Sequence, residues 1–265
     1  MLDIREHLFA ELHQKVFGFE IRVNQAGVLA GVRKAVEFAT ELGLKIEFFS
    51  QDGDRVEPGH CVFRGKGEAE KIVRAEEMML GCLGKPSGVA TAANRAVELA
   101  GERLKVVCGA WKKVAAEVRQ ELRQAIKLGG AGIRITEEPF VYLDKNYIRM
   151  LGGITPAVER AKMLPGRSVV VQLRGNGPAI EGEAKEAVEA GAGILMIDTG
   201  DEADLKRVIE LAQRDGWRDR VKIAFAGGVT FDKIPRLANL GADIVDVGRA
   251  IIDAPLLDFR LDVTG

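Results

Sequence analysis

The chain has 265 residues, of which 47% are hydrophobic and 6% aromatic, and its 38 basic and 39 acidic side chains nearly cancel. This length is enough for a barrel with a smaller partner domain. The balanced charge argues against a nucleic-acid partner, and no apolar run is long enough to span a bilayer, so we expect a cytoplasmic protein that uses neither nucleic acid nor membrane.

The first hundred residues predict helices mixed with short strands. Asp3 is expected to cap a first helix that ends at Gly18. The elements expected next are a turn and helix over 27–42, a strand over 45–50, a turn over 51–60, a strand over 61–67, and two helices over 67–85 and 86–102.

From Lys105 onward, short apolar runs alternate with helical patterns. The runs lie at 105–110, 140–144, 168–173, 193–198, 221–226 and 243–248, and the main helical stretches at 115–130, 182–193, 202–216 and 232–243. The runs are rich in Val and Ile with little alternation, which is typical of parallel strands buried on both faces. The pattern fits either an open doubly wound sheet or a barrel. A last strand over 254–265 is expected to pair with the N-terminal part.

Cysteine and histidine usage bears on compartment and metals. Cys61, Cys82 and Cys108 are far apart, and the three histidines do not cluster with them. We therefore expect reduced thiols and no metal site made of protein ligands alone.

The two last predicted strands of this series each run into a glycine turn. Gly227-Gly228 follows one, and Gly248-Arg249 follows the other. Such turns let the backbone approach a ligand, and a helix that begins there directs its N–H groups at an anion. Two in tandem on the last strands of a barrel indicate a phosphate site. The alternative is that both are ordinary strand-to-helix turns.

Charged residues follow several other predicted strands. Because catalytic groups in such folds lie at the carboxyl ends of strands, we expect these side chains to converge on one rim. The candidates are Lys112, Lys113, Arg134, Asp144, Lys145, Arg174 and Asp198. The excess of cations suits an acidic, phosphate-bearing ligand. Alternatively, the lysines are solvated and Asp144 pairs with Lys145.

These residues lie within a longer resemblance. From about Gly27 to the C-terminus the chain resembles the quinolinate phosphoribosyltransferase family, also called carboxylating nicotinate-nucleotide pyrophosphorylases. The motifs that carry the resemblance are GVLAGV, DGDRVEPG, RAEEMMLGCLGKPSGVAT, AIKLGGAGIR, MIDTG, FAGGVT and GADIVDVG.

The resemblance implies an α/β protein with an N-terminal α/β sandwich domain and a six-stranded TIM-like α/β barrel. The implied domains are 1–103, joined by 256–265, and 104–255. The family reaction, a step of NAD biosynthesis, moves a phosphoribosyl group from phosphoribosyl pyrophosphate to quinolinate and releases pyrophosphate and carbon dioxide. It uses Mg²⁺, and the enzymes are homodimers or higher homo-oligomers.

Several family motifs are altered in this chain. Glu77 stands where the family has an arginine, Trp111-Lys112-Lys113-Val114 replaces Thr-Arg-Lys-Thr, and Arg134-Ile135 replaces His-Arg. Asp144-Lys145-Asn146-Tyr147 replaces Lys-Asp-Asn-His, whereas Asp198, Gly227-Gly228 and Gly248 are kept. The changes fall on the residues expected to bind the two substrate carboxylates, since lysine cannot form the paired hydrogen bonds that arginine makes to a carboxylate. The residues expected to bind phosphate are unchanged.

The resulting hypothesis is a phosphoribosyltransferase-like enzyme that joins phosphoribosyl pyrophosphate to an acidic N-heterocycle other than quinolinate. The expected roles are catalysis for Asp198, Lys113 and Lys145, substrate binding for Lys112, Arg134, Asp144 and Arg174, and phosphate binding for Gly227, Gly228, Gly248 and Arg249. The alternatives are a lyase or isomerase of another phosphorylated molecule, with Lys145 as base or Schiff-base amine, and a non-catalytic ligand-binding relative.

Overall fold

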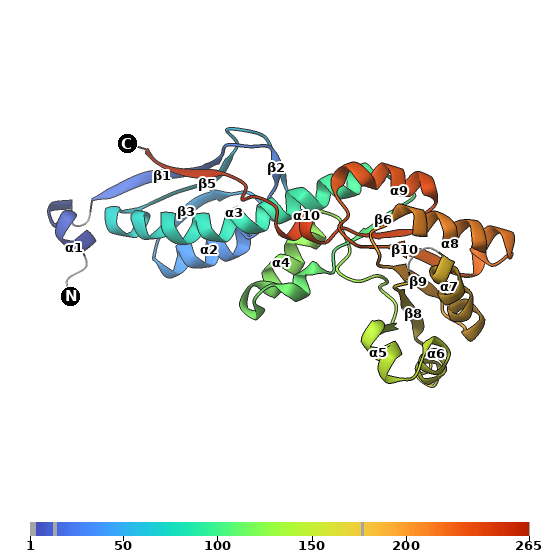
Figure 1. Ribbon diagram of the computed structural model, residues 1–265. Helices are drawn as coiled ribbons and strands as arrows, with labels where there is room; N and C mark the ends of the chain where they lie inside the picture. Colours follow the sequence, from blue (N-terminus) through green and yellow to red (C-terminus); the bar gives the residue numbers. More distant parts are fainter. Residues whose placement is uncertain (1–3, 13–14, 176–177, 265) are drawn as a thin grey trace. The chain divides into compact units, whose positions relative to one another are not determined.

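A computed structural model describes residues 4–12, 15–175 and 178–264. The chain divides into two compact units (Figure 1). The first comprises Met1–Asn94, Val114–Gly130 and Asp253–Gly265, and the second comprises Arg95–Lys113 and Ala131–Ile252. Within the described residues, no helix is both long and apolar enough to cross a membrane.

The first unit is built on a four-stranded antiparallel sheet of order β12-β1-β5-β3. Its elements are α1 (Ile4–Leu8), η1 (Ala10–Leu12), β1 (Val16–Val23), β2 (Gly27–Val28), α2 (Val32–Glu41), β3 (Lys45–Phe49), β4 (Arg55–Val56), β5 (Cys61–Glu68), α3 (Ala69–Ala100), α4 (Ala116–Leu128) and β12 (Phe259–Thr264). The C-terminal β12 pairs with β1, so that Gly18 lies opposite Thr264. The short β2 and β4 pair with each other.

Alternation along β1 determines which face of this sheet is buried. Phe19, Ile21 and Val23 are fully buried, while the residues between them are partly accessible. Because successive side chains of a strand point to opposite faces, these three lie on one face. They pack with α2 and α3, which cover that face in Figure 1, into one hydrophobic core. This unit is the N-terminal antiparallel-sheet domain.

Two predictions for this part of the chain are wrong. The first helix ends at Leu8, and β1 already begins at Val16, so Gly18 lies inside a strand; the proposed cap, Asp3, lies outside the described residues. The helices expected on either side of Pro86 form the single helix α3. Proline removes the donor that would bond the Cys82 carbonyl. That carbonyl packs against the backbone of Gly31, where a Cβ would lie 2.1 Å from its oxygen.

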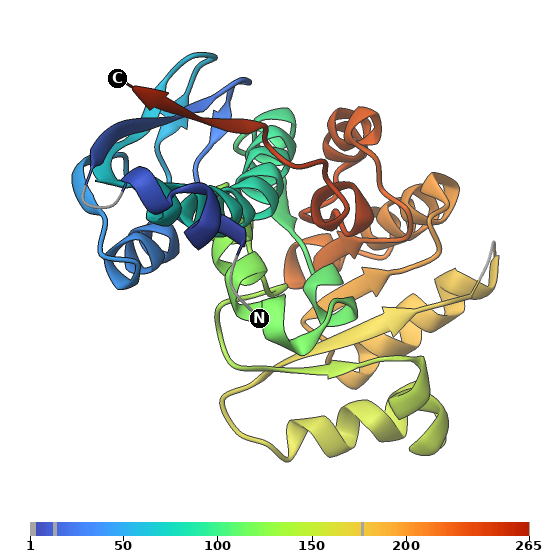
Figure 2. The same ribbon diagram turned by 90° about the vertical axis from the view of Figure 1, so that its left-hand side faces the viewer.

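The second unit holds a six-stranded parallel sheet of order β6-β11-β10-β9-β8-β7, seen best in Figure 2. Its strands are β6 (Lys105–Val107), β7 (Phe140–Leu143), β8 (Ser168–Leu173), β9 (Ile194–Ile197), β10 (Lys222–Phe225) and β11 (Ile244–Asp246). Each coincides with a predicted apolar run. The helices and 3-10 turns are η2 (Ala110–Lys113), α5 (Lys145–Met150), α6 (Ile154–Lys162), α7 (Pro178–Ala190), α8 (Glu202–Arg214), η3 (Arg218–Arg220), η4 (Phe231–Lys233), α9 (Ile234–Leu240) and α10 (Arg249–Ile252).

The interior of this sheet shows that it curves into a barrel-like form. One buried cluster takes side chains from β6, β8, β9, β10 and β11, and Phe140 and Tyr142 of β7 pack against it. Strands at opposite edges of the sheet therefore share one core, as they do when a sheet curls on itself. The helices α7, α8 and α9 lie along the outer face in Figure 1. The six-stranded barrel-like architecture expected from the resemblance is confirmed.

Candidate functional site

The carboxyl ends of the barrel strands surround a cavity of about 380 Å³, which we call the rim pocket. It is lined by Gly109, Ala110, Lys112, Lys113, Tyr142, Asp144, Lys145, Gln172, Met196, Asp198, Ala226, Gly227, Gly228, Val229, Asp246, Gly248 and Arg249. Most of the residues proposed from the sequence thus lie together. Its four cations, on Lys112, Lys113, Lys145 and Arg249, outnumber its three carboxylates, on Asp144, Asp198 and Asp246.

Asp198 directly follows β9 and is held by Gln172, which lies in β8, and by Arg174, which follows β8. Gln172 Nε2 donates to Asp198 Oδ2, and Arg174 Nη1 donates to the Asp198 backbone oxygen and lies 3.3 Å from Oδ2. Arg174 therefore reaches the site through Asp198 and is not among the residues that line the rim pocket. Gln172 Oε1 also accepts from the backbone N–H of Lys145 at 2.9 Å. This glutamine fixes two candidate residues at once.

Asp144 caps a helix, a role that was not predicted from the sequence. Its Oδ1 accepts from the backbone N–H groups of Asn146 and Tyr147, which makes it the N-cap of α5. A capping carboxylate satisfies donors that the first helical turn leaves open. No ion pair between Asp144 and Lys145 is recorded among the described residues, and the Lys145 side chain is left to line the rim pocket.

The glycine turn after β10 differs from the strand–glycine–helix arrangement expected, whereas a helix does begin directly after Gly248. Gly227 has φ of 107° and Gly228 of 69°, and the next element is the 3-10 turn η4, so α9 begins only at Ile234. The helix α10 after Gly248 has four residues. Within the described chain, the amides of Gly228 and Gly248 donate to no other protein atom. Anion binding here would therefore depend on turn amides more than on helix dipoles.

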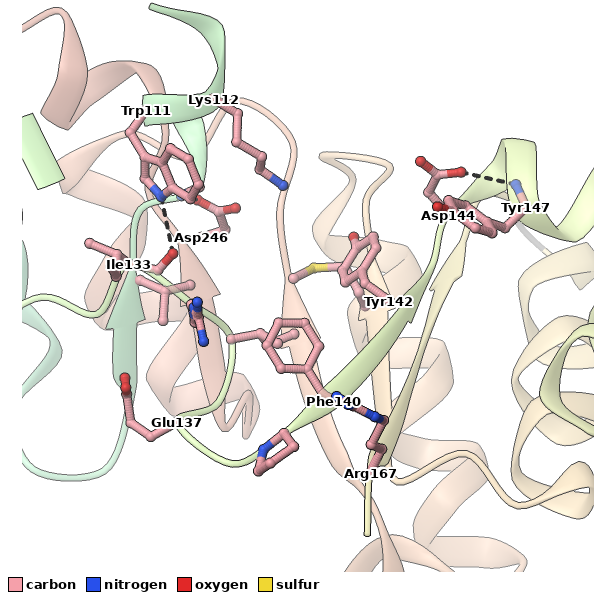
Figure 3. Close-up of a pocket in the computed structure, with 16 residues that line it drawn as sticks. Trp111, Lys112, Ile133, Glu137, Phe140, Tyr142, Asp144, Tyr147, Arg167 and Asp246 are labelled. Atoms are coloured by element: carbon pink, nitrogen blue, oxygen red, sulfur yellow. Dashed lines mark hydrogen bonds between the residues drawn. The ribbon is translucent and has the colours of Figure 1, made fainter. Parts of the chain in front are cut away.

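A second, larger cavity of about 720 Å³ opens beside the rim pocket, between the edge strands β6 and β7; we call it the barrel pocket (Figure 3). It is lined by Val107, Gly109, Trp111, Lys112, Ile133, Arg134, Ile135, Glu137, Pro139, Phe140, Tyr142, Asp144, Tyr147, Arg167, Met196 and Asp246. Arg134, the remaining sequence candidate, lies here. Six residues line both cavities: Gly109, Lys112, Tyr142, Asp144, Met196 and Asp246.

Aromatic side chains give the barrel pocket flat walls. The Trp111 indole N–H donates to the Ile133 carbonyl at 3.0 Å, which fixes the ring. Phe140 and Tyr142 project from β7 on the opposite side in Figure 3, and the Lys112 ammonium lies 5.8 Å from the centre of the Tyr142 ring. Planar walls of this kind suit an aromatic ligand.

Charge in the barrel pocket is balanced, unlike that of the rim pocket. Its cations are Lys112, Arg134 and Arg167, and its carboxylates are Glu137, Asp144 and Asp246. A ligand with two carboxylates would meet as many negative as positive side chains. The barrel pocket therefore suits a ligand of low net charge.

Asp246 is the residue that the sequence reasoning missed. It ends β11, is partly buried and lines both cavities, with Oδ1 accepting from the Gly109 backbone N–H at 3.0 Å. Burial raises the pKa of the Asp246 carboxyl above its ordinary value, against the opposing effects of the Gly109 hydrogen bond and of Lys112. The signal was present in the sequence, because Asp246 stands at a predicted strand end like Asp198, two residues before the Gly248 turn.

This raised pKa predicts how an Asp246→Asn variant responds to pH. A carboxyl whose pKa is raised by folding destabilises the native state once it ionises, so the penalty appears as the pH rises above 3.8 and is complete above the raised folded value. Asparagine is neutral and can still accept from Gly109. We expect Asp246→Asn to have a higher Tm than the parent protein near about pH 8 and no advantage at low pH.

Thermal unfolding monitored by circular dichroism across this pH range measures that difference. Asp219→Asn, a change of the same kind on the exposed turn η3, serves as the control. A lower Tm for Asp246→Asn at every pH would show that the ionised carboxylate stabilises the fold.

The cysteines and the potential metal ligands form no additional site within the described residues. Cys61, Cys82 and Cys108 are free thiols, as predicted, and burial raises the pKa of Cys108 to about 12, which makes it a poor nucleophile. Among residues 4–12, 15–175 and 178–264, no three His, Cys, Asp or Glu side chains are grouped to hold a metal ion. A divalent cation at this rim would need ligands from a bound molecule as well.

Comparison with known proteins covers both units. Residues 89–262 match the family description "Quinolinate phosphoribosyl transferase, C-terminal domain", and residues 3–87 match its N-terminal counterpart. A probable carboxylating nicotinate-nucleotide pyrophosphorylase of Archaeoglobus fulgidus is 32% identical over 240 residues, 89% of this chain and 90% of the relative. One from Methanothermobacter thermautotrophicus is 28% identical over 250 residues, 93% and 88% respectively. The crystal structure of the Pyrococcus furiosus nicotinate-nucleotide pyrophosphorylase shares the fold, with a TM-score of 0.86 and 22% identity over 99% of this chain and 73% of that one.

Proposed function

Because this chain belongs to the quinolinate phosphoribosyltransferase family, we propose that it transfers the phosphoribosyl group of phosphoribosyl pyrophosphate to a ring nitrogen of a heterocycle other than quinolinate. The chain is homologous to nicotinate-nucleotide pyrophosphorylases, which are pentosyltransferases. The observation that carries the proposal is the pair of adjoining pockets, one cationic and one aromatic and balanced in charge. They suit a phosphorylated donor and a ring acceptor side by side.

The rim pocket supplies the groups that the donor needs. The turn amides at Gly227, Gly228 and Gly248, with Arg249, would hold the 5-phosphate, and Lys112 and Lys113 would bind the pyrophosphate. As the C1–O bond to pyrophosphate breaks, positive charge develops on the ribose. The carboxylate of Asp198, oriented by Gln172 and Arg174, would stabilise that charge. Lys145, positioned by Gln172, faces the same pocket.

Magnesium would enter this pocket on the donor. The rim pocket fits a substrate-borne ion, because it offers carboxylates of Asp144 and Asp198 without a closed cage of protein ligands. When bound, the ion supplies positive charge that offsets the charge of the departing pyrophosphate.

Quinolinate itself fits the barrel pocket poorly. It carries two carboxylates, whereas this pocket pairs three cations with three carboxylates. Glu77, which stands where the family has an arginine, is an exposed residue that bonds Arg5 at 2.6 Å. Glu77 lines neither pocket, so it is the balanced charge of the barrel pocket that disfavours an acceptor with two negative charges.

The test uses purified protein, magnesium and phosphoribosyl pyrophosphate, with and without quinolinate. We expect the donor to raise Tm, by mass action on the native state, and quinolinate not to accelerate pyrophosphate release. No change of Tm at any donor concentration would overturn the phosphoribosyltransferase proposal. Rapid release that depends on quinolinate would overturn only the choice of acceptor.

A further inference from the structure

We propose that the acceptor is an N–H heterocycle, such as an azole, and that the Asp246 carboxylate binds its ring N–H and takes the proton during transfer. This inference rests on the proposed function and names the substrate class of the same site. It concerns a residue that lies in the GADIVDVG motif but is not among the site candidates proposed from the sequence.

The backbone at the ends of two neighbouring strands fixes the position of the Asp246 carboxyl. Asp246 ends β11, and Gly109 follows the neighbouring β6 and donates its N–H to Oδ1. A Cβ at residue 109 would lie 2.8 Å from Asp246 Oδ2, so glycine is what allows the carboxyl to sit there. Among the described residues, Gly109 N–H is the only hydrogen-bond donor recorded for this carboxyl. Its second oxygen is left to accept from a ligand in either pocket.

The surroundings of Asp246 match a planar ring with a polar edge. Figure 3 shows Asp246 behind the fixed indole of Trp111, with Tyr142 across the cavity. The charged groups that act on Asp246 are Lys112, Lys113 and Asp198, and all three also line the rim pocket. A ring bonded to Asp246 would therefore lie next to the donor groups.

A carboxylate at this point discriminates between two kinds of nitrogen nucleophile. The ring nitrogen of a pyridine such as quinolinate carries a lone pair and no proton, so a carboxylate facing it repels it. The N–H of an azole donates to the carboxylate instead. A bound ring that shields this carboxylate from water without donating to it is unfavourable, which adds to the selectivity.

The transfer step balances in atoms and charge. The acceptor nitrogen forms a bond to C1 of the phosphoribosyl group, and the C1–O bond to pyrophosphate breaks with its electron pair leaving on the pyrophosphate oxygen. The ring N–H proton passes to Asp246, which later releases it to water. Burial raises the pKa of the Asp246 carboxyl above its ordinary value, which makes the carboxylate a stronger base for that proton.

Calorimetric titration of the full chain with benzimidazole and with 1-methylbenzimidazole, in the presence and absence of phosphoribosyl pyrophosphate and magnesium, tests the proposal. The two ligands differ at the ring N–H, so no variant is needed for the first comparison. We expect the N–H ligand to bind at least about tenfold more tightly, and Asp246→Asn to abolish that preference. Asp219→Asn, the same kind of change at an exposed residue that lines neither pocket, should change affinity less than about threefold.

Equal binding of the two ligands, no binding of benzimidazole under either condition, or a preference that survives in Asp246→Asn would overturn the proposal. A pyrophosphate-release assay with the same ligands separates this failure from that of the proposed function. If the donor binds and only an acceptor without N–H is turned over, the proposed transferase activity is supported and the proposed role of Asp246 is overturned. If the donor does not bind but benzimidazole binding depends on Asp246, the azole site is supported and the proposed phosphoribosyl transfer is overturned.

Discussion

An Asp198→Asn variant is expected to release pyrophosphate from phosphoribosyl pyrophosphate about a hundredfold more slowly than the parent protein. The carboxylate lies at the end of β9 in the rim pocket, where two neighbours fix its orientation. Asparagine has the same shape and can still accept from Gln172, but it lacks the negative charge. The loss should therefore fall on the rate at saturating donor, since the charge matters most when the ribose becomes cationic.

Steady-state pyrophosphate release, measured over a range of donor concentrations, gives that rate. Asp201→Asn is the matched control, because Asp201 lies three residues along the same loop and caps α8 through a bond to the Ala203 N–H. Asparagine is an equally good cap, so this variant should keep its rate within about twofold. If Asp198→Asn also keeps its rate, the ribose cation is stabilised by another group, and Asp246 is then the next carboxylate to examine.

The barrel could be predicted from the sequence because each of its strands is a short run of consecutive apolar residues. Six runs rich in Val and Ile coincide with β6 to β11, since strands covered on both faces need apolar residues at consecutive positions. The N-terminal helix misled the prediction, because helical spacing of apolar residues up to Val16 said nothing of the pairing of β1 with β5 and β12. Pro86 misled it for a similar reason, since tertiary packing keeps α3 continuous.

The candidate site could be predicted in composition but not in arrangement. The strand-end rule brought Lys112, Lys113, Asp198 and the glycine turns to one rim, where they lie. It could not separate the rim pocket from the barrel pocket, because that division depends on how β6 and β7 face each other across the curled sheet. It also could not show that Asp144 caps α5, since the same residue could equally have faced a ligand.

The two glycines after β10 have different reasons to be glycine, and two alanine variants should separate them. A Cβ on Gly227 would lie 2.4 Å from the backbone nitrogen of Gly200, whose N–H bonds the Ala226 carbonyl. At φ of 107° alanine is strained as well, and the loops after β9 and β10 would have to separate. We expect Gly227→Ala to lower the free energy of unfolding by about 3 kcal/mol, measured by urea denaturation.

Gly228→Ala is the informative counterpart, because a Cβ there would meet no protein atom within 4 Å. This variant should lower the free energy of unfolding by about 1 kcal/mol, which is the strain of holding an alanine at φ of 69°. The new methyl group would instead project beside an amide that donates to no other described protein atom, and it would keep a phosphate from approaching. We expect the Kd for phosphoribosyl pyrophosphate, measured by calorimetry, to rise about tenfold in this variant. If Gly228→Ala binds the donor normally, the turn is an ordinary strand connection, and the 5-phosphate must be held by Gly248 and Arg249 instead.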